Sequence, residues 1–161
     1  STRFGGGYSA NFPTEALGFC FFSTRPSGVG FYLDLKASVP MIYGSDDFYD
    51  NISVYQSEAW GDRLIEEKDT WISVNVALTR VLSTRVAMYG GVGFSANTAF
   101  RQYYDEFHIL GTNGRYWVEA GDESHVNLMG GVLVILGSSW GLQLGGEAQP
   151  AGVTAGVFWT G

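Results

Sequence analysis

Residues 29–38 read VGFYLDLKAS, and the alternation in this stretch decides the fold. Every second residue, from Val29 to Ala37, is apolar, and the residues between them are small, aromatic or charged. Successive side chains of a β-strand point to opposite faces. The stretch therefore predicts a strand with one apolar face and one largely polar face.

The same period of two recurs along the whole chain. In a second clear example, Ile72, Val74, Val76 and Leu78 alternate with Trp71, Ser73, Asn75 and Thr79. Most of the segments have 8 to 12 residues, close to the roughly 9–11 that a tilted strand needs to cross a bilayer. Eight strands are predicted: 3–12, 17–24, 28–38, 70–80, 85–95, 124–135, 140–148 and 152–159.

The charged residues of these segments share one parity, except Arg80 at the end of its strand, where the long stem can reach the interface. A charge on a lipid-facing wall costs about 2–4 kcal/mol for Arg or Lys at the bilayer midplane, so the uncharged parity is expected to face lipid. A soluble β-sandwich would instead have polar outward faces. We therefore predict a polar network in the barrel lumen from Arg3, Asp34, Lys36, Arg85, His125 and Glu147.

The lumen is expected to be narrow and filled. Eight strands leave an interior that side chains just fill, and many glycines fall on the inward parity. The bulky inward residues should pack there, namely Tyr32, Trp71, Tyr89 and Phe158. Cys20, the only cysteine, is expected to be a small buried side chain without a disulfide or metal pattern.

Length and connections complete the predicted architecture. No stretch approaches the roughly 20 apolar residues of a membrane-spanning helix. The chain of 161 residues is expected to be a single barrel domain, residues 1–161, whose start at Ser1 suggests a mature sequence. Every second connection between the predicted strands is short, and both long loops, 39–69 and 96–123, belong to the other set of connections. With both termini periplasmic, those loops would be extracellular.

The last hairpin supports this architecture by resemblance. GGEAQPAGVTAGVFW, residues 145–159, is similar to the final strands of the small outer-membrane barrels of the OmpA/OmpX type. The resemblance implies an all-β, eight-stranded, antiparallel up-and-down transmembrane β-barrel in a bacterial outer membrane. It also implies that Trp159 or Phe158 acts as the aromatic end recognised by the barrel-assembly machinery, although Thr160 and Gly161 follow here.

The two long loops are acidic. They hold thirteen of the sixteen acids and only four basic residues, Arg63, Lys68, Arg101 and Arg115. Nucleic acid requires Lys and Arg, so it is excluded as a partner. The acids are Asp46, Asp47, Asp50, Glu58, Asp62, Glu66, Glu67, Asp69, Asp105, Glu106, Glu119, Asp122 and Glu123.

The loops are also aromatic, which indicates order. Residues 99–110 and 115–123 flank the turn signature Gly111-Thr112-Asn113-Gly114 and predict a hairpin that continues two strands. The aromatic residues either pack the loops together or bind a partner, such as another envelope or extracellular protein. The candidate partner-binding residues are Tyr49, Tyr55, Trp60, Tyr103, Tyr104, Phe107, Tyr116 and Trp117.

No metal or cofactor is predicted. Asp46, Asp47, Asp50 and Asn51 could offer oxygens to Ca²⁺, but they lack the spacing of an EF-hand loop, so a solvated acidic loop is favoured. Divalent ions could also bridge the acids to lipopolysaccharide phosphates. Lipid and lipopolysaccharide are the other expected partners.

Catalysis is the alternative function. Ser124 and His125 lie beside Asp122 and Glu123, as a lipid A-modifying enzyme would need near the rim. Neighbouring strand residues point to opposite faces, however, so Ser124 and His125 would not share a hydrogen bond. His108 lies farther along the predicted hairpin. We predict a non-enzymatic, structural or partner-binding barrel without catalytic residues; the alternatives are a lipid-modifying enzyme and a small pore.

Overall fold

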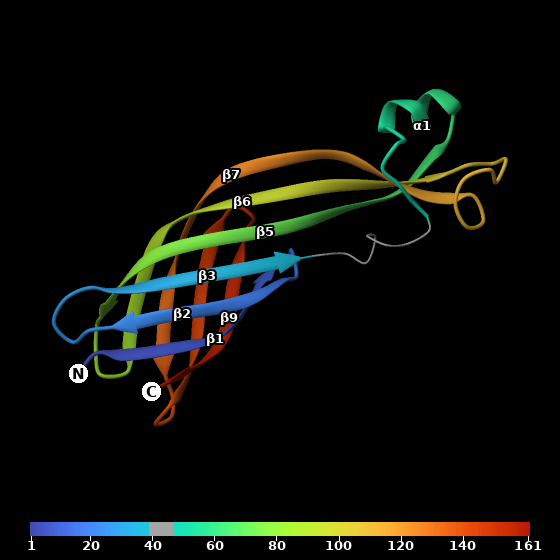
Figure 1. Ribbon diagram of the computed structural model, residues 1–161. Coiled ribbons are helices and arrows are strands. Elements are labelled where there is room, and N and C mark those ends of the chain that lie inside the picture. Colours follow the sequence, from blue (N-terminus) through green and yellow to red (C-terminus); the bar gives the residue numbers. More distant parts are fainter. Residues whose placement is uncertain (39–46) are drawn as a thin grey trace. The chain divides into compact units, whose positions relative to one another are not determined.

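A computed structural model describes residues 1–38 and 47–161 (Figure 1). Asp46 and Tyr43 of the first predicted loop lie outside the described residues. No helix in the described ranges is long and apolar enough to cross a membrane. The elements are β1 (Arg3–Phe12), β2 (Ala16–Thr24), β3 (Gly30–Ser38), β4 (Phe48–Tyr49), α1 (Val54–Trp60), β5 (Arg63–Val81), β6 (Val86–Tyr104), β7 (Arg115–Ile135), β8 (Trp140–Ala148) and β9 (Ala151–Thr160).

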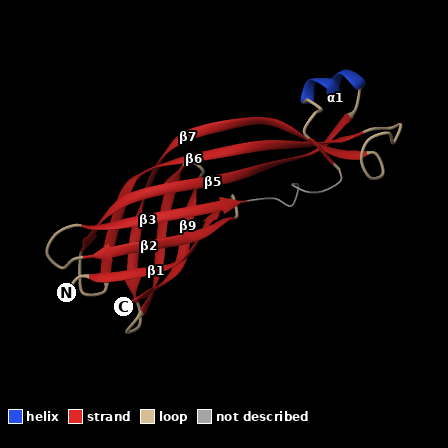
Figure 2. Cartoon of the chain, viewed as in Figure 1, coloured by secondary structure: helices blue, strands red, loops and turns tan. Residues whose placement is uncertain are grey.

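The chain divides into two compact units. The barrel unit comprises Ser1–Ser38, Trp71–Ala96 and Ser124–Gly161. The loop unit comprises Val39–Thr70 and Asn97–Glu123. The strands β5, β6 and β7 have residues in both units, because each is about twice as long as the other five strands of the barrel (Figure 2).

The barrel unit is a closed sheet of eight strands. The order β7-β6-β5-β3-β2-β1-β9-β8 closes through a further pairing between β7 and β8. The pairing is antiparallel, with Leu33 of β3 opposite Val76 of β5 and Asp34 opposite Asn75. Both termini lie at the end of the barrel that carries the turns 25–29, 82–85 and 136–139 (Figure 1). This architecture confirms the predicted fold class.

The outer wall of the barrel unit is apolar, as the alternation predicted. Exposed residues include Phe31 and Leu35 on β3 and every second residue of β5 from Ile72 to Leu78. Their inward neighbours Tyr32, Asp34 and Lys36 are buried. A barrel with an uncharged apolar exterior and a polar interior is the arrangement that suits a lipid solvent.

The interior is filled by aromatic rings and by backbone segments that lie close to these rings. Tyr32 stacks on Tyr89, and Phe22 meets Phe158 edge-on with ring centroids 5.0 Å apart. A Cβ atom at Gly145 would collide with the Tyr89 hydroxyl, so the small inward residues make room for the large ones. Cys20 is buried, as predicted. Trp71 was expected to be interior too, but it is only half-buried.

The loop segments agree with the sequence prediction in one feature and differ from it in two. The strands β6 and β7 continue into the 96–123 segment as the expected hairpin: β6 ends at Tyr104, and β7 begins at Arg115. The strand β5, however, already begins at Arg63, although a loop was expected up to residue 69. Residues 63–69 are exposed on both faces and therefore carry no alternation to detect. The helix α1 was not predicted either.

Candidate functional site

The loop unit is built around a short, well-capped helix. The Ser53 hydroxyl accepts the backbone N–H of Gln56, and the Gln56 side chain accepts the backbone N–H of Ser53, which is a capping box. At the other end Gly61 adopts the left-handed conformation and its N–H bonds back to Glu58. These caps stabilise α1, although the helix has only seven residues.

Aromatic residues form the core of the loop unit. Tyr103 and Tyr116 are buried together with Val118. The Tyr116 hydroxyl bonds to Ser57 Oγ at 2.8 Å and to Asp62 Oδ2 at 2.5 Å, which ties β7 to α1 and to the start of β5. Burial raises the pKa of Tyr116, and its contact with Asp62 raises it further, so the phenol remains a neutral donor.

Asp105 organises the end of the hairpin. Its carboxylate accepts backbone N–H groups of Phe107, Ile109 and Leu110 at 2.7–3.0 Å. Desolvation opposes the charged form, but these three donors outweigh it and hold the pKa of Asp105 below its ordinary value. The turn closes at Asn113 and Gly114, both with positive φ, as the Asn-Gly pair predicted.

This arrangement presents an apolar groove at the surface of the loop unit. The groove has a volume of about 390 Å³. Phe107 and Ile109 are 82% and 79% exposed, and Trp60 is 54% exposed. The Asp105 carboxylate anchors the backbone of Phe107 and Ile109, and Trp60 is contributed by α1. Together these large apolar side chains form a patch of the kind that marks interaction sites. We define the apolar groove by its lining residues: Trp60, Asp62, Asp105, Phe107, Ile109 and Leu110.

The predicted partner-binding residues therefore fall into two groups. Tyr103, Tyr116 and Trp117 are buried and pack within the loop unit, so they present little surface to a partner. Tyr49 and Tyr104 are half-buried, whereas Trp60, Phe107 and Tyr55 are exposed. Ile109 and Leu110 were not among the predicted binding residues, because nothing in a lone aliphatic pair reveals that Ile109 is exposed while Leu110 packs against the core of the loop unit.

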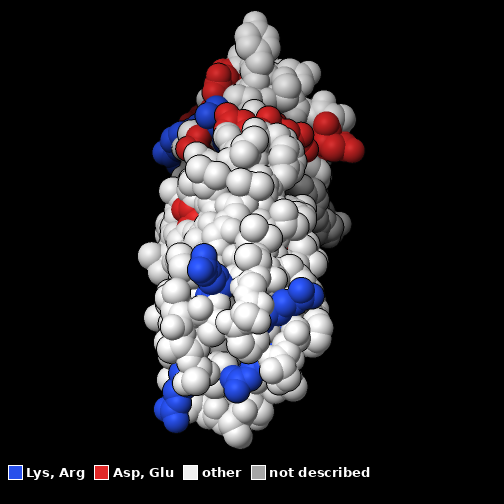
Figure 3. All heavy atoms as spheres, turned by 90° about the vertical axis from the view of Figure 1, so that its left-hand side faces the viewer, with Lys and Arg blue, Asp and Glu red and all other residues white. Residues whose placement is uncertain are grey.

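The charges of the loop unit are mostly acidic. Three of its four basic side chains contact groups of the same unit: Arg101 bonds to Glu67 at 2.8 Å, and Lys68 lies 3.3 Å from Glu66. The guanidinium of Arg63 lies over the Tyr104 ring. Figure 3 shows acidic side chains gathered together, while separate Lys and Arg side chains lie on an otherwise uncharged surface. The loop unit thus offers an apolar groove within an acidic surface.

The barrel unit contains the other candidate cluster. The ammonium of Lys36 contacts the carboxylates of Asp34 and Glu147, and all three side chains are fully buried. Ser9 donates to Asp34 at 3.1 Å, and Asn75 accepts a hydrogen bond from Asn127 at 2.8 Å. The polar residues of neighbouring strands therefore complete a satisfied network around the buried ions.

Three of the six predicted lumen residues form one buried cluster. Asp34, Lys36 and Glu147 lie together, but Arg3 and Arg85 are exposed. Arg3 lies at the start of β1, where it lines the open end of the barrel interior, and Arg85 lies in the turn before β6. His125 is half-buried and its ring lies 6.2 Å from that of Trp71. Parity identified the inward direction of these residues but not their depth in the barrel.

Neither a family model nor a curated protein sequence matches the chain. Among solved structures it is similar to Ail, the attachment invasion locus protein of Yersinia pestis, with a TM-score of 0.55, 11% identity and coverage of 99% of this chain and 93% of that one. Ail in complex with the heparin analogue sucrose octasulfate is matched with a TM-score of 0.50, 11% identity and coverage of 99% and 94%. The chain has the fold of a small outer-membrane β-barrel.

The two histidines of this barrel lie in different surroundings. Ser124 is exposed and His125 is half-buried, and adjacent strand residues point to opposite faces. His108 shares a hydrogen bond of 2.9 Å with the Tyr104 hydroxyl in the loop unit. Within residues 1–38 and 47–161, no group of three or more His, Cys, Asp or Glu side chains could hold a metal ion.

Proposed function

We propose that this outer-membrane barrel is a non-enzymatic binding protein whose apolar groove receives a segment of another protein. The termini would be periplasmic and the loop unit extracellular. The observation that carries the proposal is the exposure of Trp60, Phe107 and Ile109 around one groove. Aromatic anchors in a pocket are the residues that most often dominate binding energy at protein interfaces.

The surroundings of the groove specify the chemistry of the partner. Asp62 and Asp105 line it, and the loop unit carries thirteen acids against four bases. Ail forms a complex with a sulfated heparin analogue, but an acidic surface disfavours such a polyanion here. The proposed partner is a protein segment with an aliphatic or aromatic anchor flanked by Lys or Arg. Its association rate should fall as salt screens the charges.

Crosslinking in intact outer membranes tests the proposal. A photoreactive benzoylphenylalanine at position 107 should give a discrete protein adduct, whereas the same group at position 55 should not. Tyr55 is a matched control, because it is 79% exposed on α1 yet does not line the groove. A Trp60→Ala, Ile109→Asp variant should lose the adduct while the protein keeps its folded, heat-resistant mobility on a gel.

Removal of the binding surface provides a second arm. With the photoreactive group placed at position 60 of the groove instead, the full-length chain should give the same adduct. Replacing 99–121 by a short Gly/Ser turn removes Phe107 and Ile109 from the groove and should leave a folded barrel without that adduct. Equal adducts at positions 55 and 107, or adducts that survive the groove substitutions, would refute a binding site in the groove. A partner captured only through the barrel wall would refute the role of the loop unit altogether.

A further inference from the structure

The barrel unit has a second pocket, which the proposed function does not use. It lies at the end with the turns 25–29, 82–85 and 136–139 and has a volume of about 230 Å³. Its inner part is apolar, formed by Phe22, Ala87, Leu133 and Phe158. These four are buried residues of the barrel core, so the pocket continues the apolar part of the lumen to the surface.

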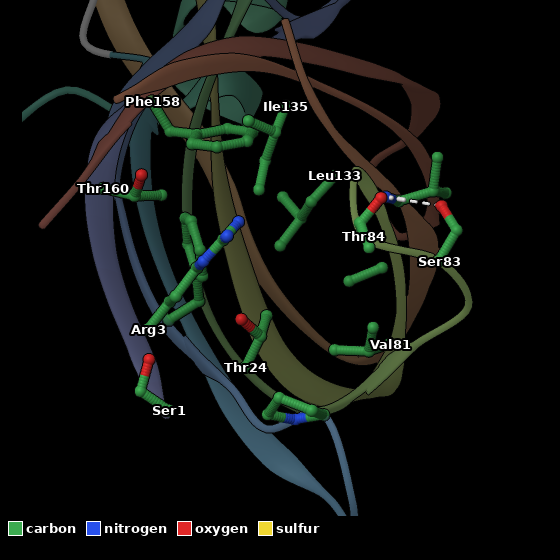
Figure 4. Close-up of a pocket in the computed structure, with 14 residues that line it drawn as sticks. Ser1, Arg3, Thr24, Val81, Ser83, Thr84, Leu133, Ile135, Phe158 and Thr160 are labelled. Atoms are coloured by element: carbon green, nitrogen blue, oxygen red, sulfur yellow. Dashed lines mark hydrogen bonds between the residues drawn. The ribbon is translucent and has the colours of Figure 1, made fainter. Parts of the chain in front are cut away.

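The mouth of the pocket is polar and carries a cation. Hydroxyl groups of Thr24, Thr84 and Thr160 lie around it, and Arg3 extends from β1 into the opening (Figure 4). Arg3 is exposed and has no ion-pair partner among the described residues. An unpaired guanidinium above an apolar floor is the complement of a molecule with an anionic head and an apolar tail.

The charge distribution of the barrel unit strengthens this complementarity. Its exposed basic residues, Arg3, Arg25, Arg80 and Arg85, all lie at the ends of strands or in turns on this side. Its three acids lie elsewhere: Asp34 and Glu147 are buried against Lys36, and Glu15 lies in the β1–β2 turn at the opposite end. Four like charges at this end of the barrel, one of them in the pocket itself, raise the local concentration of anions.

We propose that this pocket binds a small anionic amphiphile, with its headgroup on Arg3 and its tail against Leu133 and Phe158. A carboxylate or a phosphate head satisfies the guanidinium equally well in geometry. The volume lies below the roughly 300–1,000 Å³ of pockets for drug-sized ligands, so the bound tail is short or only its end enters. The inference is independent of the partner proposed for the loop unit.

Binding is tested with four probes on the full chain in phosphatidylcholine nanodiscs. Hexanoate and hexyl phosphate carry both features, hexanol lacks the charge, and inorganic phosphate lacks the tail. Methyl resonances of Leu133 and Ile135 report on the pocket, and that of Val76 on the outer wall reports on partition into the bilayer. Saturable shifts at Leu133 with the two anionic amphiphiles, at concentrations where hexanol and phosphate give none, are expected.

Two arginine variants form a matched pair. Arg3→Gln should weaken binding about ten- to hundredfold, because it removes a charge-assisted hydrogen bond. Arg25→Gln removes an exposed charge from the same end but does not line the pocket, so binding should change less than threefold. Both positions are exposed, so folding should be preserved in each variant.

Each other result would overturn the proposal. Equal affinity for hexanol would mean that the pocket selects only apolar tails. Shifts with phosphate alone would indicate a simple anion site, and shifts at Val76 without Leu133 would indicate only partition into the bilayer. Equal weakening by Arg3→Gln and Arg25→Gln would indicate general electrostatic attraction instead of a headgroup site.

Discussion

The rings of Tyr32 and Tyr89 stack across the barrel interior with their centroids 4.4 Å apart and 7° between the ring planes. They come from β3 and β6, which are not neighbours in the sheet. The Gln143 amide donates to both hydroxyls, at 2.6 Å and 3.2 Å. The two stacked rings and Gln143 therefore form a hydrogen-bonded group that spans and blocks the lumen.

Purified protein in planar bilayers should show no steady conductance of the porin type. An eight-stranded barrel filled by side chains leaves no continuous aqueous path. Replacing both Tyr32 and Tyr89 by Ala should raise the frequency of small conductance events, because it removes the stacked bar. Tyr8→Ala on the outer wall is the control and should leave the recordings unchanged. Large reproducible channels in the native protein would contradict the filled lumen.

Val76→Arg should impair folding into lipid. Val76 is 55% exposed near the middle of the membrane part of β5, where an arginine costs about 2–4 kcal/mol. Leu82→Arg introduces the same side chain at an exposed turn at the end of the barrel, where the cost falls to about 0–1 kcal/mol. Urea titrations in vesicles compare the two variants. Similar free energies of unfolding would mean that the exposed wall does not face lipid.

Lys36→Met should destabilise the barrel by about 3–5 kcal/mol, because two buried carboxylates lose their shared counter-ion. Adding Asp34→Asn and Glu147→Gln should recover most of this loss, since neutral amides can keep the hydrogen bonds without the buried charge. Unfolding in urea provides the measurement. If the triple variant were as unstable as Lys36→Met alone, packing by the lysine stem would be the main contribution.

Acid should loosen the hairpin end of the loop unit. The three backbone donors lower the pKa of Asp105, so its stabilisation is complete above the ordinary aspartate pKa of about 3.9 and is lost as pH falls through the lower folded value. Amide exchange of Ile109 and Leu110 should rise in that range. Asp105→Asn should show fast exchange already at neutral pH, whereas the exposed neighbour variant Glu106→Gln should follow the native protein.

His125→Ala should leave the lipid A mass profile of overexpressing cells unchanged. The ring of His125 lies beside that of Trp71, and its strand neighbour Ser124 points to the opposite face. Mass spectrometry of extracted lipid A provides the measurement, with the exposed Ser124→Ala variant as a companion. A change in acylation that disappears with His125→Ala would favour the lipid-modifying alternative over the proposed binding role.

Local patterns were sufficient for the barrel wall and insufficient for the loop unit. The period of two in residues such as Ile72 to Leu78 depends only on strand geometry and on the solvent at each face, so it is visible without any contact. Strand β5 before Thr70 has water on both sides and no such pattern. The helix α1 has only seven residues, too few to display a clear helical period.

The sequence by itself determined which side chains point inward, which wall is uncharged and where the Asn113-Gly114 turn lies, because parity and turn chemistry are local properties of the chain. Only the tertiary structure decided which of these groups meet. Lys36 contacts Glu147 across 111 positions, and Tyr116 contacts Ser57 across 59, while Phe107 remains exposed. Burial and side-chain pairing depend on strand register and on closure of the barrel, which bring together residues that are far apart in the sequence. No local sequence pattern specifies which of these residues meet.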